Sequence, residues 1–215
     1  MRLDKNALQL YAVTDRSWLR GRSFWAVLEE ALAAGVTFLQ LREKDVDPVT
    51  LLELAKGARS IAERHKVPFV VNDHVDVALA CNADGVHIGQ GDLPAKDVRR
   101  MIGPEKILGV SAQTIEQAIQ AEREGADYLG VGTIFPTSTK PDAQPVDLKT
   151  LKEICAAVSI PVVAIGGIDA ENALQLKGCG LAGIAVVSAI FAQDNIREAV
   201  TKLRQVARQV VCHED

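Results

Sequence analysis

The chain has 215 residues, of which 48% are hydrophobic and 24% are charged, a balance typical of one globular domain and unlike that of a disordered chain. The net charge of −4 lacks the basic excess of a nucleic-acid-binding surface, and no apolar run is long enough to span a membrane. Residues 1–6 lack the apolar core of a signal peptide, so we expect a cytoplasmic protein with no nucleic-acid or membrane partner.

Short apolar segments alternate with longer amphipathic ones along the chain. Several short segments are rich in Val and Ile without strict alternation, as in strands buried on both faces of a parallel sheet. We predict strands at residues 8–14, 37–42, 68–72, 85–88, 107–111, 128–131, 161–165 and 183–187. The clearest helical patterns cover residues 25–34, 49–65, 116–124, 148–157 and 195–210.

Local signals mark the ends of several helices. Asp47 followed by Pro48 predicts a helix start, and residues 114–117 form a capping-box pattern. Gly35 and Gly125 stand where a helix end favours glycine. With a helix expected after every strand, the pattern predicts an α/β protein, a (β/α)8 TIM barrel in which residues 1–215 form a single catalytic domain. The alternative is an open doubly wound sheet, but no G-x-G-x-x-G follows the first strand.

In a barrel of this kind the active site lies at the carboxyl ends of the strands. Gly166 and Gly167 follow the seventh predicted strand and Ser188 follows the eighth, which is the common phosphate site of this fold. Glycines let backbone N–H groups approach an anion, and helix N-termini favour negative charge. We therefore predict a phosphate site here, the alternative being a tight turn with no ligand.

Three cations follow predicted strands: Arg42, Lys44 and Lys140. Lys140 belongs to a long loop that also holds Thr137 and Thr139, and long loops in compact domains usually carry function. The alternative is an ordinary solvated loop. If the three cations converge, their ligand is more anionic than one phosphate, and a pyrophosphate ester fits that charge.

Two aspartates, Asp73 and Asp92, follow neighbouring strands, and oxygen ligands beside a phosphate-rich substrate suit Mg2+. The alternative is that each caps the next helix. Ser111 ends the fifth strand, and because Thr114 already serves as a cap, its hydroxyl is expected to be free for a ligand. We interpret His87, within the fourth strand, as a structural histidine, and no nucleophile–base pair is evident. This favours catalysis by stabilisation of a leaving group.

The ordered set of motifs resembles the thiamin phosphate synthase family over nearly the whole chain. The motifs that carry the resemblance lie at residues 10–15, 40–45, 71–73, 85–90, 109–112, 130–137, 140, 164–168 and 187–190. One position departs from the family, which usually has His where this chain has Gln113.

The resemblance implies a transferase of thiamin biosynthesis. A hydroxymethylpyrimidine pyrophosphate loses pyrophosphate, and the nitrogen of thiazole phosphate, or of its carboxylate, attacks the methylene carbon of the resulting carbocation. The resemblance implies that the pyrimidine pyrophosphate binds to Gln40, Arg42, Lys44, Asn72, Ser111 and Lys140. Four of these residues are then expected to be catalytic: Lys140, Ser111, Arg42 and Lys44. The thiazole phosphate binds Thr137, Thr139, Gly167, Val187 and Ser188, and Asp73 and Asp92 hold Mg2+.

Two alternatives are a thiazole tautomerase and a non-catalytic sensor of thiamin phosphate. The tautomerase would not need the pyrophosphate residues, and Gln113 cannot act as an acid or base there. A sensor would tolerate loss of Asp73 and Asp92, and this chain keeps both. The sequence leaves the oligomeric state open, a homo-oligomer included.

Overall fold

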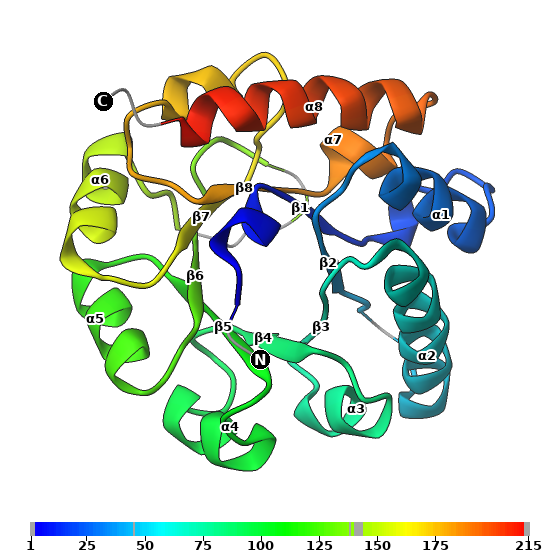
Figure 1. Cartoon of the computed structure of the whole chain (residues 1–215), viewed down its shortest axis with the longest axis horizontal. Helices are drawn as coiled ribbons and strands as arrows, with labels where there is room; N and C mark the ends of the chain where they lie inside the picture. Colours follow the sequence, from blue (N-terminus) through cyan, green and yellow to red (C-terminus); the bar gives the residue numbers. More distant parts are fainter. Residues whose placement is uncertain (1–2, 45, 138, 140–143, 213–215) are drawn as a thin grey trace.

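A computed structural model describes residues 3–44, 46–137, 139 and 144–212. Eight parallel strands close into a barrel, in which each strand pairs with the next and β1 pairs with β8 (Figure 1). The predicted (β/α)8 barrel is therefore confirmed, and the open doubly wound sheet is wrong. The strands are β1 (Leu10–Val13), β2 (Phe38–Leu41), β3 (Phe69–Asn72), β4 (Gly85–Ile88), β5 (Ile107–Ala112), β6 (Tyr128–Val131), β7 (Val162–Ile165) and β8 (Gly183–Val186).

The helices surround this barrel in chain order (Figure 1). They are α1 (Phe24–Ala34), α2 (Pro48–His65), α3 (Val75–Ala80), α4 (Ala95–Ile102), α5 (Ile115–Arg123), α6 (Leu148–Ala157), α7 (Ser188–Phe191) and α8 (Ile196–Val211), with 3-10 turns η1 (Lys5–Leu8), η2 (Arg16–Trp18) and η3 (Ala173–Leu176). The expectation of a helix after every strand is wrong at β7, which only η3 follows. Gly178 and Gly180 have positive φ just beyond η3, a conformation in which a helix cannot continue.

The predicted helix ends are confirmed by their hydrogen bonds. The side chain of Asp47 accepts from the backbone of Val49 at 3.1 Å and of Thr50 at 3.0 Å, so α2 begins where expected. At α5 the hydroxyl of Thr114 accepts from the backbone of Gln117 at 3.2 Å. The Gln117 side chain does not complete an ideal capping box, because it accepts from the backbone of Gln113 instead of Thr114.

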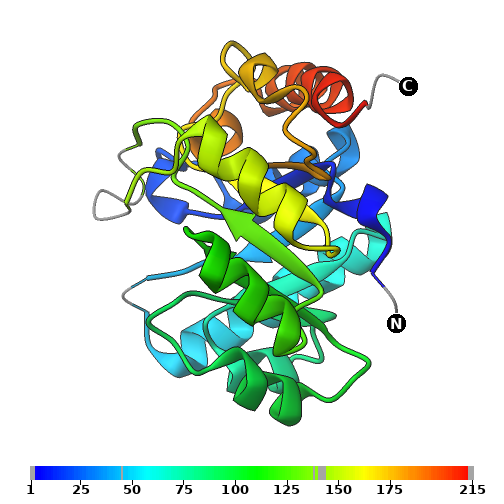
Figure 2. The same cartoon turned by 90° about the vertical axis from the view of Figure 1, so that its left-hand side faces the viewer.

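The core has two parts. One lies between the strands and the helices, and the other fills the barrel interior with Leu8, Tyr11, Val13, Phe38, Val70, Ile107, Tyr128, Val163 and Ala185. Leu8 belongs to η1, which lies at the end of the barrel opposite the loop after β6 (Figure 2). One end of the barrel is thus closed, and a ligand must enter at the other. In the part of the chain that the structure describes, no helix is long and apolar enough to cross a membrane.

Candidate active site

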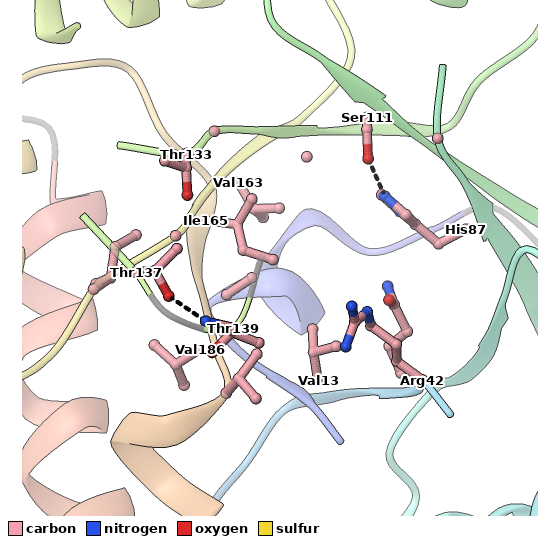
Figure 3. Close-up of a pocket in the computed structure, with 18 of the residues that line it drawn as sticks. Val13, Arg42, His87, Ser111, Thr133, Thr137, Thr139, Val163, Ile165 and Val186 are labelled. Carbon is pink, nitrogen blue, oxygen red and sulfur yellow. Dashed lines mark hydrogen bonds between the residues drawn. The ribbon is translucent and has the colours of Figure 1, made fainter. Parts of the chain in front are cut away.

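A cavity of about 340 Å³ opens at the carboxyl ends of the strands, where the sequence predicted the site. It is lined by these predicted residues: Gln40, Arg42, Asn72, Ser111, Thr137, Thr139, Gly167, Val187 and Ser188. In Figure 3, Arg42 and the Ser111–His87 pair lie on one side of the cavity, and Thr137 and Thr139 lie on the other. The site therefore has a face with a cation and a face rich in hydroxyls.

Three of the predicted residues that the structure describes, Lys44, Asp73 and Asp92, do not line this cavity. Lys44 is exposed, so the expected convergence of three cations is not seen among the described residues. Lys140 lies outside the described residues. Asp73 and Asp92 stand just beyond the cavity, and Asp92 lines an adjacent hollow that shares Gly89 with it.

The Arg42 side chain is held by negative charge that the sequence reasoning missed. Its Nη1 lies 3.7 Å from Oδ2 of Asp15, and its backbone N–H donates to Thr14 Oγ1 at 3.0 Å. Next to it, Glu43 pairs with Arg16 at 2.8 Å, and burial raises the pKa of Glu43 despite this partner. The positive charge at the site is therefore smaller than three cations would give, because Asp15 neutralises part of the charge of Arg42.

The Ser111 hydroxyl is not free, contrary to expectation. It forms a 3.0 Å hydrogen bond with Nε2 of His87, whose Nδ1 lies 2.9 Å from the hydroxyl of Tyr128. The sequence showed no nucleophile–base pair, but the structure places a serine and a histidine within hydrogen-bonding distance, so this expectation is wrong as far as their contact goes. The described partner of its Nδ1 is a phenol and not the carboxylate of a hydrolase triad. The structural interpretation of His87 is confirmed in that both ring nitrogens have partners.

This network continues across the barrel interior. The Tyr128 hydroxyl lies 2.7 Å from the hydroxyl of Tyr11, which accepts from Nε2 of Gln40 at 2.5 Å. Burial raises the pKa of both phenols, so each keeps its proton. Positions 11 and 128 are brought together only by barrel closure, and no local pattern in the sequence links them.

The two aspartates follow neighbouring strands, and neither caps a helix. The side chain of Asp92 accepts from the backbone of Gly89 at 2.7 Å, and α4 begins at Ala95, after the N-cap residue Pro94, without a side-chain cap. Oδ2 of Asp73 accepts from Nδ2 of Asn72 at 2.6 Å, and α3 also begins without a side-chain cap. The capping alternative is therefore wrong for both.

This carboxylate pair suits Mg2+, which is satisfied by one or two protein carboxylates when water and substrate oxygens complete its shell. Among the described residues no group of three or more His, Cys, Asp or Glu gathers as a fuller ligand set. An ion bound here would accordingly need oxygens from elsewhere, and a diphosphate supplies them.

The turn after β7 meets the loop after β6. Gly166 and Gly167 have φ of 102° and 63°, and an added Cβ would lie 1.9 Å from Thr133 Oγ1 and 2.5 Å from the carbonyl of Pro136, respectively. Backbone geometry and packing thus already require both glycines. Gly167 nevertheless lines the cavity beside Val187 and Ser188 at the start of α7, as a phosphate site would require.

Gln113, where the family usually has His, contacts the same loop. Its Nε2 lies 3.4 Å from the carbonyl of Gly132 and 3.4 Å from that of Gln144, so it donates weakly to both ends of the loop after β6. The departure thus changes the support of this loop.

These features place the chain among the (β/α)8-barrel enzymes, whose small-molecule substrates bind at the carboxyl ends of the strands. A family model described as thiamine monophosphate synthase matches residues 10–190. The thiamine-phosphate synthase of Clostridium tetani (strain Massachusetts / E88) is 53% identical over 194 residues, covering 90% of this chain and 93% of that protein. The corresponding protein of Methanobrevibacter smithii (strain ATCC 35061 / DSM 861 / OCM 144 / PS) is 50% identical, covering 91% and 93%. The solved thiamine phosphate pyrophosphorylase of Pyrococcus furiosus is 39% identical with a TM-score of 0.89, covering 97% and 99%.

The chain belongs to the thiamine-phosphate synthase family. It is a transferase that condenses a pyrimidine pyrophosphate with thiazole phosphate in thiamine biosynthesis, and this family uses Mg2+. The comparisons give no support to a tautomerase or to a non-catalytic sensor.

Proposed function

We propose that the cavity binds the pyrimidine pyrophosphate against β2, β3 and β5, with Gln40 and Asn72 around the ring and with Ser111 and Arg42 toward the diphosphate. The observation that carries this placement is that all four side chains line one cavity. Among the described residues that line the cavity, Arg42 is the one Lys or Arg side chain, and its guanidinium can bind two phosphate oxygens at once. Lys44 and Lys140 add charge on the solvent side when the substrate is bound.

The thiazole phosphate then occupies the opposite side of the cavity. Thr137 and Thr139 supply donors there, and Gly167, Val187 and Ser188 surround the phosphate. This arrangement sets the two substrates side by side at the open end of one barrel, and we propose that residues 1–215 work as this single catalytic domain.

In this proposal Asp73 and Asp92 would hold Mg2+, which would supply positive charge for the departing pyrophosphate. Arg42 stabilises the same developing charge from the cavity lining, which is how a preplaced cation lowers a barrier to dissociation, and Lys140 adds its charge to that of Arg42. No residue has to remove a proton from the thiazole nitrogen, because this nitrogen attacks the methylene carbon with its lone pair.

The reaction is tested by mixing the purified protein with both substrates, with Mg2+ or with EDTA. We expect pyrophosphate and thiamin phosphate in equal amounts, and at least about 100-fold slower release with EDTA. Conversion of the thiazole phosphate alone would indicate the tautomerase, and binding of thiamin phosphate without turnover would indicate the sensor.

A further inference from the structure

Five side chains form one continuous series of hydrogen bonds through the barrel interior, which we call the polar wire: Gln40, Tyr11, Tyr128, His87 and Ser111. The four links measure 2.5, 2.7, 2.9 and 3.0 Å in that order. The wire crosses from β2 through β1, β6 and β4 to β5. Its two ends, Gln40 and Ser111, both line the cavity, whereas Tyr128 in its middle is fully buried.

With a neutral imidazole, the wire has only two directions in which the hydrogen of each phenol is used within it. Each phenol has one hydrogen to donate, and the imidazole has one donor and one acceptor. If Gln40 donates to Tyr11, then Tyr11 donates to Tyr128, which donates to Nδ1 of His87. Nε2–H of His87 then donates to Ser111, whose own hydrogen is left to point at the cavity.

The opposite direction reverses both ends together. Ser111 then donates to Nε2 of His87, and the amide of Gln40 accepts from Tyr11 through its oxygen. Ser111 now presents only lone pairs to the cavity, and Gln40 presents its NH2. In a mixed arrangement one phenol oxygen accepts both of its bonds, so the hydrogen of that buried phenol has no acceptor within the polar wire, which costs the energy of a lost hydrogen bond.

We propose that the polar wire couples recognition of the two ends of the pyrimidine pyrophosphate. The inference rests on the proposed placement of that substrate between Gln40 and Ser111. An amino group on the ring is a donor, so it favours the direction in which Gln40 turns its oxygen to the cavity. A diphosphate is an acceptor, so it favours the same direction, in which Ser111 donates. Tyr11, Tyr128 and His87 are then positioning residues for this reaction.

The surroundings of the polar wire keep it continuous. A Cβ added at Gly109 would lie 2.2 Å from Cζ of Tyr128 and 2.4 Å from Nδ1 of His87. At Gly130 it would lie 3.1 Å from Cε1 of the His87 ring. Glycine at these positions on β5 and β6 therefore makes room for the link between His87 and Tyr128. Because burial raises the pKa of both phenols, neither loses the hydrogen that sets the direction.

The test measures linkage between two separate ligands by calorimetry. One is inorganic pyrophosphate with Mg2+, and the other is 4-amino-2-methyl-5-hydroxymethylpyrimidine. The coupling factor is the affinity for pyrophosphate with saturating pyrimidine divided by the affinity without it. We expect Tyr128→Phe to lower this factor at least about fivefold, while each ligand alone binds within a few-fold of the unmodified protein.

An analogue and a control variant sharpen the test. The 4-oxo pyrimidine, an acceptor at the position of the amino group, should give a smaller coupling factor than the amino compound in the unmodified protein. In Tyr128→Phe the two compounds should give the same factor. Thr37→Val is the matched control, because the Thr37 hydroxyl also bonds a neighbouring strand, at 2.8 Å from the backbone N of Leu10, but lies outside the polar wire. It should lower thermal stability and leave the coupling factor unchanged.

An unchanged coupling factor in Tyr128→Phe overturns the proposal. If that variant does not fold, Tyr11→Phe breaks the same wire at another link and must give the same loss. If both ligands bind but the amino and oxo compounds give the same coupling factor in the unmodified protein, the coupling role of the polar wire is contradicted. The proposed function is not affected by that result. Failure of the unmodified protein to bind either ligand would remove the proposed placement as well.

Discussion

Single substitutions at the strand ends can separate charge from structure. Asp92→Asn removes the charge but keeps an oxygen that accepts from the backbone of Gly89, where the native bond measures 2.7 Å. Because this side chain does not cap α4, we expect little change in thermal stability. The Mg2+ concentration for half-maximal pyrophosphate release should rise at least about tenfold, because ligand charge sets the affinity.

Asp97→Asn is the matched control for this substitution. Asp97 lies in the first turn of α4, and its exposed carboxylate pairs with Arg100 at 3.3 Å. The Mg2+ requirement should not change in this variant. If both variants shift the requirement equally, the effect comes from general surface charge and not from a ligand at position 92.

The predicted residues that line the cavity share one property, namely a position at or just after the carboxyl end of a strand. Once the barrel is predicted, that position alone brings Gln40, Ser111 and Ser188 to the same end. Partners within the barrel are different. Tyr11 and Tyr128 are separated by 117 positions, and Arg42 meets Asp15 from the neighbouring strand. Such contacts depend on the orientation of side chains in a closed barrel, which periodicity along the chain does not encode.

At the scale of the elements, Arg22 links the first loop to the end of α7. Its Nη2 donates to the carbonyl of Phe191 at 2.6 Å, and its Nη1 donates to the carbonyl of Gln193 at 2.5 Å. The opposite end of α7 carries Ser188, at the proposed phosphate site. We expect Arg22→Met to raise the KM for thiazole phosphate about tenfold, since a loosened helix misplaces its N-terminus. Steady-state kinetics with each substrate varied in turn should show a smaller change for the pyrimidine pyrophosphate.

Arg100→Met serves as the control for Arg22. Arg100 is largely exposed, and its side chain pairs with Asp97 on the same helix. Both KM values should stay unchanged in this variant. Equal increases of the two KM values in Arg22→Met would show that the whole barrel has been disturbed, and would contradict a role confined to α7.

Helix caps link the stability of the elements to pH. Hydrogen bonds from Thr50 lower the pKa of Asp47 below its ordinary value of 3.8, and hydrogen bonds from Thr150 lower the pKa of Asp147 likewise. A carboxyl whose folded pKa is depressed stabilises the fold above the unfolded pKa, and this contribution is lost as the pH falls through the folded pKa. We expect the thermal midpoint of Asp47→Ser, which keeps a capping oxygen but cannot titrate, to fall less between pH 5 and pH 3 than that of the unmodified protein.

Caps could be predicted because they join residues two or three positions apart, as Asp47 joins Val49 and Thr50. The missing helix after β7 could not be predicted in the same way. There the chain turns through η3 and two glycines of positive φ, and the length of the connection alone does not distinguish a 3-10 turn from an α-helix.

At the scale of the whole molecule, stability and ligand binding depend on two different regions of the closed barrel. The helices and the outer face of the strands share one continuous apolar cluster, which provides stability. The strand ends and the loops at the open end hold the polar residues of the cavity. Substitutions in the two regions should therefore affect different measurements.

Leu203 and Lys140 test this division together. Leu203 is 1% exposed on α8 in the apolar cluster, so Leu203→Ala should lower the free energy of unfolding by about 2–5 kcal/mol. Its turnover number should stay unchanged at a temperature where the variant is folded, because Leu203 is not among the described residues that line the cavity. Lys140→Ala should do the reverse, lowering turnover about 10²–10³-fold with an unchanged denaturation midpoint, if Lys140 stabilises the departing pyrophosphate. Urea titrations and single-turnover rates on the same two preparations decide between these outcomes. Normal turnover in Lys140→Ala would remove this lysine from the mechanism, and a loss of turnover in folded Leu203→Ala would show that the apolar cluster also sets the geometry of the cavity.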